Sequence, residues 1–426
     1  MPSAAHPSYI IVGAGVFGAS TALELINAEP EARIVLIDRT SYPCPLAASH
    51  DYNKVVRADY GDLFYMRIAL KARRYWKERP LYEPFFHECS LVNIDNTGLG
   101  RRMIENYKTL DEPNDATVVG PKDLKTKFDH LFEDFDEEDV HECYVNSNSG
   151  WAEAASAVQA VIGAAVEKGV KYEEASIASL TFDQNGGCTG VLTKDGRSFS
   201  AGRIILSTGA ATAKLIADSA PDRPDIQVED RLTAAAVITG VAKLTPEQAG
   251  EYKNIPVWIH SVGKTVGETM PIAPGGIMKI TRDISFKNTY THEASGQVIS
   301  APPDEPDYGQ HTIPQGLRDE IETVKKGIYG RQVADLSIDS YRICWDAITP
   351  NQDFIISPHP RCPHLYIATG GSFHGWKFLP VLGEYVVQML RGTLSEEAAR
   401  RWAWDREQKG AAQGGLMPRR ELRDIL

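Results

Sequence analysis

The stretch SYIIVGAGVFGAS, residues 8–20, decides the fold of this chain. An apolar run that ends at Val12 predicts a buried strand. Gly13, Gly15 and Gly18 follow it and predict a turn in which backbone N–H groups can approach a pyrophosphate. The pattern therefore predicts a bound dinucleotide, although a glycine turn that only packs a helix against a sheet gives the same spacing.

Two flanking features strengthen the dinucleotide prediction. Residues 17–26 predict a helix whose positive N-terminus faces the phosphates. Twenty-five positions after Gly13, Asp38 ends a second apolar run, residues 34–37, where its carboxylate can accept bonds from a ribose hydroxyl. The residues predicted to contact this part of the dinucleotide are Gly13, Gly15, Val16, Phe17, Gly18, Asp38 and Arg39.

The composition excludes several classes of partner. With 45 basic and 57 acidic residues, the chain has a net charge of -12, which repels nucleic acid and anionic lipid. No apolar run approaches the roughly 20 residues that cross a bilayer, and the first run lacks a basic leader. We therefore expect an unsecreted protein without a membrane span. Six cysteines without a C-x-x-C pair indicate neither a disulfide framework nor a zinc site, so no metal is expected.

The chain of 426 residues is long enough for two or three structural regions. Strands ending in small residues and glycine recur at 203–209 and 365–371, and both can return to the first sheet. Alternation at 233–242 and 276–281 predicts a half-exposed antiparallel sheet. Helices are expected at 152–168, 315–329 and 380–391, and strands at 170–172, 177–182 and 188–193, with an irregular excursion at 78–145.

The expected fold class is therefore α/β, with a discontinuous Rossmann-like cofactor domain and a substrate domain that contains a mixed or antiparallel sheet. The cofactor domain is predicted to comprise residues 1–85, 148–222 and 338–426, and the substrate domain residues 86–147 and 223–337.

Other common enzyme motifs are incomplete. Trp376 separates the last glycine from Lys377 where a phosphate-binding P-loop would need a lysine followed by Ser or Thr. His374 replaces the second glycine of a serine-hydrolase elbow, and the eleven histidines show no metal-binding spacing. A redox enzyme that uses NAD or FAD is favoured at this point.

Four segments together point to one family. The glycine turn, residues 49–57, residues 343–350 and residues 371–380 resemble the monomeric sarcosine oxidase and fructosyl amino acid oxidase (amadoriase) family, which includes saccharopine and pipecolate oxidases. The resemblance implies bound FAD, a two-domain fold and oxidation of the secondary amine of an N-substituted amino acid by O2, which gives an imine and H2O2.

The resemblance also assigns roles to individual residues. Cys344 matches the position that carries FAD through a thioether, and a cation such as Arg342 could lower the pKa of its thiol. Lys279 matches the oxygen-activating lysine, and Arg57 and Lys377 match the pair that binds the substrate carboxylate, with Tyr60 and His374 in the same pocket. Further FAD contacts are expected from Ser49, His50, Lys54, Gly209, Gly371, Gly375 and Lys377. From the residues alone, an inert buried cysteine and solvent-facing basic side chains remain alternatives.

The substrate branch is ambiguous. Arg57 and residues 348–354 favour sarcosine and pipecolate oxidases, whereas residues 150–151 and 378–383 favour fructosyl amino acid and saccharopine oxidases. Asp283 can substitute for a second acidic residue of the amadoriases, while Arg282 favours a substrate with an extra carboxylate or phosphate.

The expected partners are a small amino acid substrate and O2, with a monomeric protein. Two alternatives are a flavin dehydrogenase that uses another electron acceptor and a nucleotide-binding protein of the same fold without activity. The resemblance implies a cytoplasmic or peroxisomal location, although residues 423–426 do not form a peroxisomal Ser-Lys-Leu signal.

Overall fold

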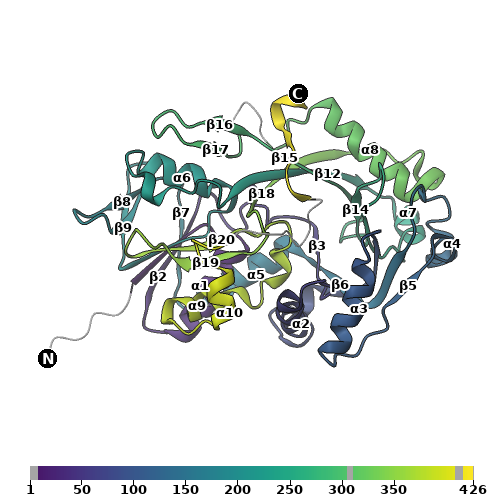
Figure 1. The fold of residues 1–426 in the computed structure, drawn as a ribbon, viewed down its shortest axis with the longest axis horizontal. Helices are drawn as coiled ribbons and strands as arrows, with labels where there is room; N and C mark the ends of the chain where they lie inside the picture. Colours follow the sequence, from purple (N-terminus) through teal and green to yellow (C-terminus); the bar gives the residue numbers. More distant parts are fainter. Residues whose placement is uncertain (1–7, 305–309, 408–415, 426) are drawn as a thin grey trace.

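The computed structural model describes residues 8–304, 310–407 and 416–425. Its first sheet has the strand order β19-β20-β11-β1-β2-β7 (Figure 1). The central strand β1 (Ser8–Val12) is parallel to β2 (Arg33–Asp38) and to β11 (Arg203–Leu206). The outer strands are β7 (Lys171–Glu174), β20 (Leu365–Thr369) and the antiparallel β19 (Ile355–Pro358). This sheet confirms the predicted α/β class and the return of distant segments to one sheet.

Helices on this sheet pack closely because small residues line their contacts. The first helix, α1 (Val16–Ala28), contacts α5 (Ala154–Glu167) and α9 (Leu382–Arg391). A side chain at Gly383 of α9 would lie 2.1 Å from the Ser20 carbonyl oxygen of α1, so only glycine permits this approach. On the other side, α6 (Thr212–Ser219) packs against a small sheet of β8 (Ile177–Phe182), β9 (Cys188–Thr193) and β10 (Ser198–Ser200).

The second large sheet has ten strands and runs in the order β18-β12-β15-β14-β13-β4-β6-β3. Its strands are β3 (Asn53–Val55), β4 (Phe86–Ile94), β6 (Cys143–Glu153), β12 (Thr233–Lys243), β13 (Val257–His260), β14 (Gly267–Thr269), β15 (Ile277–Lys287) and β18 (Ser340–Ile348), with β5 (Thr117–Val119) paired to β6 and β21 (Arg420–Glu421) paired to β15. A separate hairpin joins β16 (Thr289–Thr291) and β17 (Val298–Ser300). The excursion at 78–145 is thus more regular than its sequence indicates, because β4 and β6 pair along most of their length.

The prediction of a half-exposed sheet at 233–242 is wrong for strand β12, because the nine central residues of this strand are all buried. Helix α8 (Gln315–Tyr329) covers one face of β12 and β15, as Figure 1 shows. A side chain at Gly240 would lie 2.6 Å from Ile321 of α8. The other face of the strand contributes Val237 and Thr239 to a cavity.

Most predicted elements are confirmed with small shifts of their ends. The helix at 315–329 has the predicted bounds, whereas α9 begins at Leu382 because a short 3₁₀ helix, Trp376–Phe378, precedes it. The ends of the predicted cofactor domain contribute β3 and β18 to the ten-stranded sheet, and the domain boundaries stay a prediction. The remaining helices are α2 (Leu63–Glu78), α3 (Leu99–Thr109), α4 (Pro121–Lys125), α7 (Pro246–Glu251) and α10 (Glu396–Arg401). Within the described residues, no helix has the length and apolar character that a membrane span requires.

Candidate active site

The glycine turn after β1 is packed so tightly that side chains cannot fit. Gly13 has a positive φ of 95°, and a side chain there would lie 2.4 Å from the Ser207 carbonyl oxygen. A side chain at Gly18 would lie 1.8 Å from the Gly13 carbonyl oxygen. The Val16 amide donates to the Ser49 hydroxyl at 2.8 Å, which ties the start of α1 to a later segment. The glycines therefore allow β1, the turn and α1 to pack closely, which brings the N-terminus of α1 to the edge of the sheet. A helix N-terminus in that place favours phosphate groups.

Asp38 lies at the end of β2, beside this turn. One carboxylate oxygen accepts from the Ala14 amide at 2.8 Å, and the other accepts from the Arg39 amide at 2.7 Å. Asp38 thus holds the turn in shape, and its predicted bond to a ribose hydroxyl stays a prediction.

A cavity of about 770 Å³ extends from the start of α1 to the ten-stranded sheet. The predicted site residues that line it are Val16, Phe17, Ser49, Lys54, Arg57, Gly209, Lys279, Asp283, Cys344, Gly371, His374, Gly375 and Lys377. The predicted residues outside its lining are Gly13, Gly15, Gly18, Asp38, Arg39, His50 and Tyr60. Residues from four distant segments therefore meet around one space.

Lys279 of β15 is buried in an ion pair. Its ammonium lies 2.8 Å from an Asp51 carboxylate oxygen and donates to the Asn53 carbonyl oxygen, also at 2.8 Å. Burial lowers the pKa of Lys279, and Asp51 offsets part of that effect. Burial alone would raise the pKa of Asp51, but Lys279 and Lys54 outweigh it and keep that pKa below its usual value. Asp51 is therefore a carboxylate shared by two cations.

Lys54 lines the cavity together with Cys344 and pairs with Asp51. Burial lowers the pKa of Lys54, but the charge of Asp51, at 3.0 Å, outweighs burial and raises that pKa above its usual value. The Arg342 guanidinium instead donates to the carbonyl oxygens of Pro45, Ala47 and His50. Arg342 thus anchors the segment before Lys54, and its expected effect on the Cys344 thiol stays a prediction.

Arg57 and Lys377 place two basic side chains in the cavity wall, and no carboxylate lies within ion-pair distance of either among the described residues. Arg57 donates to the Asp59 carbonyl oxygen and lies 4.9 Å from the centre of the Tyr60 ring. Lys377 donates to the Tyr60 hydroxyl at 3.1 Å and to the His374 carbonyl oxygen at 2.8 Å. Within the described residues, neither side chain forms an ion pair with a carboxylate. Burial, and then Arg57, lower the pKa of Lys377 well below its usual value.

His374 fixes the donor and acceptor roles in the hydrogen bonds that join it to Tyr60 and Tyr60 to Lys377. Its Nε2 lies 2.8 Å from the Gln352 carbonyl oxygen, which can only accept, so Nε2 carries the proton. Burial lowers the pKa of His374 to about 3, so the ring is neutral near pH 7 and Nδ1 is an acceptor. The Tyr60 hydroxyl, 3.1 Å from Nδ1, donates to it and accepts from Lys377. Tyr60 therefore does not line the cavity, but it holds two residues that do, His374 and Lys377.

Alternation along β15 decides which side chains enter the cavity. Lys279, Thr281 and Asp283 line it, as the period of two requires. Arg282 points to the opposite face, donates to the carbonyl oxygens of Lys264 and Val266, and lies 3.7 Å from Glu320. The expectation that Arg282 binds an extra carboxylate or phosphate is therefore wrong.

Several lining residues have no role in the sequence-based prediction. They are Asp51, Asn93, Ser207, Glu268 and Asp346. Asp51 lies inside the segment 49–57 that carries the resemblance, and Asp346 lies on the same face of β18 as Cys344, so both could have been found from local spacing. Asn93 and Glu268 lie far from those segments, and only the strand pairing of the large sheet brings them to the cavity.

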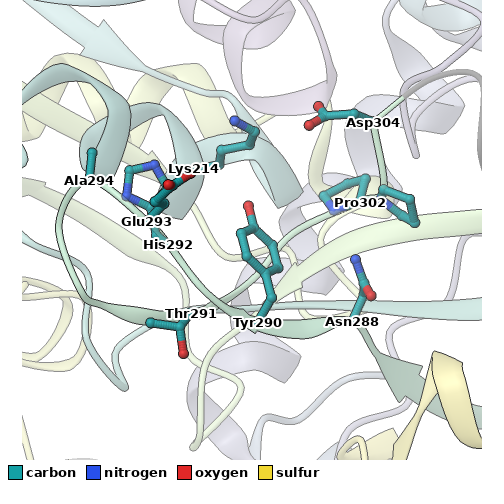
Figure 2. A pocket seen from close by; sticks show the side chains of 10 residues that line it. Lys214, Asn288, Tyr290, Thr291, His292, Glu293, Ala294, Pro302 and Asp304 are labelled. Atoms are coloured by element: carbon teal, nitrogen blue, oxygen red, sulfur yellow. The ribbon is translucent and has the colours of Figure 1, made fainter.

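A second hollow, of about 560 Å³, lies beside the β16–β17 hairpin (Figure 2). Its lining includes Tyr290, Lys214 and His292 but none of the predicted site residues. His292 bonds Asp218 of α6 and the Ser295 hydroxyl, each at 2.9 Å. Because the Gln297 amide also donates to Ser295, these contacts pin the hairpin turn to α6 and explain why His292 is buried.

Comparison with known proteins supports this site. A family model described as FAD dependent oxidoreductase, DAO, matches residues 8–389. The chain belongs to this family. It is 26% identical to an L-saccharopine oxidase of Schizosaccharomyces pombe over 94% of each chain, and 22% identical to a monomeric sarcosine oxidase of a Bacillus species over 90% of this chain and 92% of the relative. A crystal structure of a modified fructosyl peptide oxidase from Aspergillus nidulans has a TM-score of 0.84 and 26% identity, with 100% of this chain and 99% of that chain covered.

The described residues fit the FAD that this family uses. Val16 and Phe17, at the N-terminus of α1, line the cavity, where backbone N–H groups favour a phosphate. The Ser207 hydroxyl lies in the same region of the cavity lining, buried and without a partner among the described residues, so it is available to a ligand. The cavity then continues past Lys54 to Cys344. An elongated cofactor could therefore contact the protein at both of its ends.

We predict that Asp51→Asn destabilises the protein by about 3–5 kcal/mol, because it leaves Lys279 and Lys54 as buried cations without a carboxylate. Urea unfolding at pH 7 measures this loss. Because the pKa of Asp51 is lowered in the folded protein, its contribution is complete above the unfolded-state pKa of about 3.9 and is lost as the pH falls below it.

The matched control for this variant is Glu138→Gln. Glu138 pairs with Lys264 at 3.3 Å, and both side chains are exposed. Such a surface pair contributes about 0–1 kcal/mol. Equal losses in the two variants would contradict the assigned role of Asp51.

Proposed function

We propose that this enzyme is an oxidase that removes two electrons from the secondary amine of an N-substituted α-amino acid and passes them to O2. The observation that carries the proposal is the pair of buried, uncompensated cations, Arg57 and Lys377, on the same cavity as Lys279 and Cys344. A buried positive pair without a counter-ion is a receptor for an anionic group. A substrate carboxylate is the anion that the relatives' names favour.

The proposed reaction breaks the C–H bond beside nitrogen and the N–H bond, which gives an imine. O2 takes up the two electrons and two protons as H2O2, and water then hydrolyses the imine to a carbonyl product and an amine. Bound FAD would supply the two-electron acceptor between substrate and O2. Arg57 and Lys377 would orient the carboxylate, and its negative charge would raise the pKa of Lys377, which burial and Arg57 lower in the free protein. His374 stays neutral near pH 7 because burial lowers its pKa to about 3.

Lys279 is proposed to assist the transfer of electrons to O2. A buried ammonium stabilises negative charge that develops on oxygen in a site without bulk water. Lys279 and its partner Asp51 both line the cavity. Lys54 also neutralises Asp51, so removal of Lys279 would leave that carboxylate paired.

Incubation of the purified enzyme with sarcosine, pipecolate, saccharopine and fructosyl-lysine tests the proposed function. We expect H2O2 to form at the rate of O2 consumption with at least one of these N-substituted amino acids. The same compounds with a carboxamide in place of the α-carboxylate should react at least tenfold more slowly, because a neutral carboxamide cannot form an ion pair with Arg57 and Lys377. Turnover with an artificial dye but not with O2 would identify a dehydrogenase, and no reduction by any substrate would contradict enzymatic activity.

We predict that FAD is bound covalently through Cys344. Wild-type protein precipitated with acid should retain its yellow colour, whereas Cys344→Ser should release flavin into the supernatant. Cys362→Ser is the control, because Cys362 is also a buried free thiol but does not line the cavity. A colourless wild-type pellet would exclude the covalent link.

We predict that Lys279→Met slows reoxidation by O2 at least 100-fold while it changes anaerobic reduction by substrate less than tenfold. Stopped-flow absorbance of the flavin measures the two half-reactions separately. Lys287→Met is the control on the same strand, because Lys287 lies outside the cavity lining and pairs with Glu421 at 3.5 Å. Equal losses in both half-reactions would contradict an oxygen-specific role.

A further inference from the structure

The turn that follows β20 lies along the edge of β18, which is the end strand of the ten-stranded sheet. The Ser372 amide donates to the Ala347 carbonyl oxygen at 2.9 Å, and the Thr349 amide donates to the Ser372 hydroxyl at 3.2 Å. The end of a strand of the first sheet is therefore fastened to the edge of the second sheet. Gly371 and residues 373–377 then line the cavity.

Asp346 of β18 joins this turn to the strand through its side chain. One carboxyl oxygen accepts from the Phe373 amide at 2.8 Å, and the other accepts from the Ala347 amide, also at 2.8 Å. A side chain at Gly371 would lie 3.3 Å from both carboxyl oxygens, so glycine allows the turn to approach Asp346 closely. Asp346 also lines the cavity, two positions after Cys344 on the same face of β18.

The turn needs such contacts because two of its residues have an unfavourable backbone conformation. Ser372 has a φ of 50° and Phe373 a φ of 61°. This left-handed region is sterically unfavourable for residues other than glycine, and it persists only where the surrounding structure holds it. Loss of the Asp346 acceptor would leave the Phe373 amide without this partner and would favour relaxation of the turn.

The position of Lys377 depends on the same turn. The His374 and Gly375 amides donate to the Gly371 carbonyl oxygen at 2.9 and 2.7 Å, and the chain then enters the 3₁₀ helix Trp376–Phe378. The Lys377 ammonium donates back to the His374 carbonyl oxygen at 2.8 Å. The segment up to Lys377 is therefore a short, internally bonded unit, so a shift of the turn moves the ammonium with it.

We propose that Asp346 is a positioning residue for the binding of the substrate carboxylate. It holds the turn at Phe373 against β18, so that the Lys377 ammonium reaches the cavity at a fixed place relative to Cys344. The Trp76 indole of α2 donates to the Lys377 carbonyl oxygen at 2.8 Å, which fixes the same segment from a second element. This inference rests on the proposed function, because Lys377 is part of the proposed carboxylate receptor.

The hydrogen bonds of Asp346 separate this role from a purely electrostatic one. Both carboxyl oxygens accept from main-chain amides, and these amides and Lys54 act against the rise in the pKa of Asp346 that burial causes. If Asp346 acted only through its charge, removal of that charge would make the cavity more positive and strengthen the binding of an anion. A positioning role predicts the opposite change, so the sign of the change in affinity distinguishes the two roles.

Titration of the holoenzyme with propionate tests the proposal, because this unreactive carboxylate reports on binding without turnover. The change in flavin absorbance measures its Kd. We expect Asp346→Ala to raise the Kd by about tenfold, as the loss of one charge-assisted bond at Lys377 would do. Asp346→Asn keeps one acceptor oxygen and should give a smaller rise, and it carries the test if the alanine variant does not fold.

A double-mutant cycle shows whether Asp346 acts through the lysine. Lys377→Met should itself raise the Kd by about tenfold. Addition of Asp346→Ala to Lys377→Met should then change the Kd less than twofold, because the side chain that Asp346 positions is already absent. A further tenfold rise in the double variant would overturn the positioning role.

The matched control is Asp183→Ala, which should keep the wild-type Kd. Asp183 also accepts from two main-chain amides, those of Asn185 at 2.8 Å and Gly187 at 2.9 Å, but it lies in an exposed turn outside the cavity lining.

The remaining outcomes separate this inference from the proposed function. An unchanged or lower Kd in both Asp346 variants would overturn the positioning role and leave the proposed function intact. Wild-type holoenzyme that binds no propionate would overturn the carboxylate receptor and this inference together. If the expected changes in Kd are found but no N-substituted amino acid is oxidised, the proposed function alone is rejected.

Discussion

The buried pair of Lys279 and Asp51 is the contact on which the arrangement of the site depends. Lys279 belongs to the ten-stranded sheet, whereas Asp51 lies two residues after Ser49, which holds the glycine turn of the first sheet. The Lys279 ammonium needs Asp51, because an unpaired ion in a protein interior costs several kcal/mol. The two sheets are therefore held at the relative position that opens one cavity from the turn to β15. Arg342 strengthens this junction by binding three carbonyl oxygens of the segment before Asp51.

Local sequence was enough to predict the parts of the site that depend on backbone shape. The Gly13 and Gly18 positions need glycine because neighbouring carbonyl oxygens leave no room, and that requirement is visible as spacing. Arg282 was misplaced although the period of two along β15 already puts it on the face opposite Lys279. Asp51 lies in the segment that carries the resemblance, but its pairing with Lys279, 228 positions away, is not visible in that segment. Asn93 and Glu268 come together only through the register of β4, β13 and β14, which no local pattern specifies.

The basic and acidic groups of the cavity lining come from separate segments of the chain. Arg57 follows β3 of the ten-stranded sheet, whereas Lys377 follows β20 of the first sheet. Glu268 lies on β14 and Asp283 on β15, both in the ten-stranded sheet. Lys279 lies between these two acids in sequence, and Asp51 pairs with it. A substrate carboxylate could thus pair with Arg57 and Lys377 without disturbing the lysine that is proposed to act on oxygen.

Hydrogen bonds to Tyr60 and to the His374 carbonyl oxygen fix the orientation of the Lys377 side chain in the cavity wall. The Gln352 carbonyl oxygen fixes the His374 proton on Nε2, so the Tyr60 hydroxyl must donate to Nδ1 and can only accept from Lys377. Lys377 therefore has one donor committed to Tyr60 and one to the His374 carbonyl oxygen, which leaves its third donor for a ligand in the cavity that it lines. A protonated His374 would make the Tyr60 hydroxyl an acceptor from Nδ1 and would add a positive charge close to Lys377. Burial prevents that protonation near neutral pH, so the same desolvation that weakens the charge on Lys377 also keeps its orientation fixed.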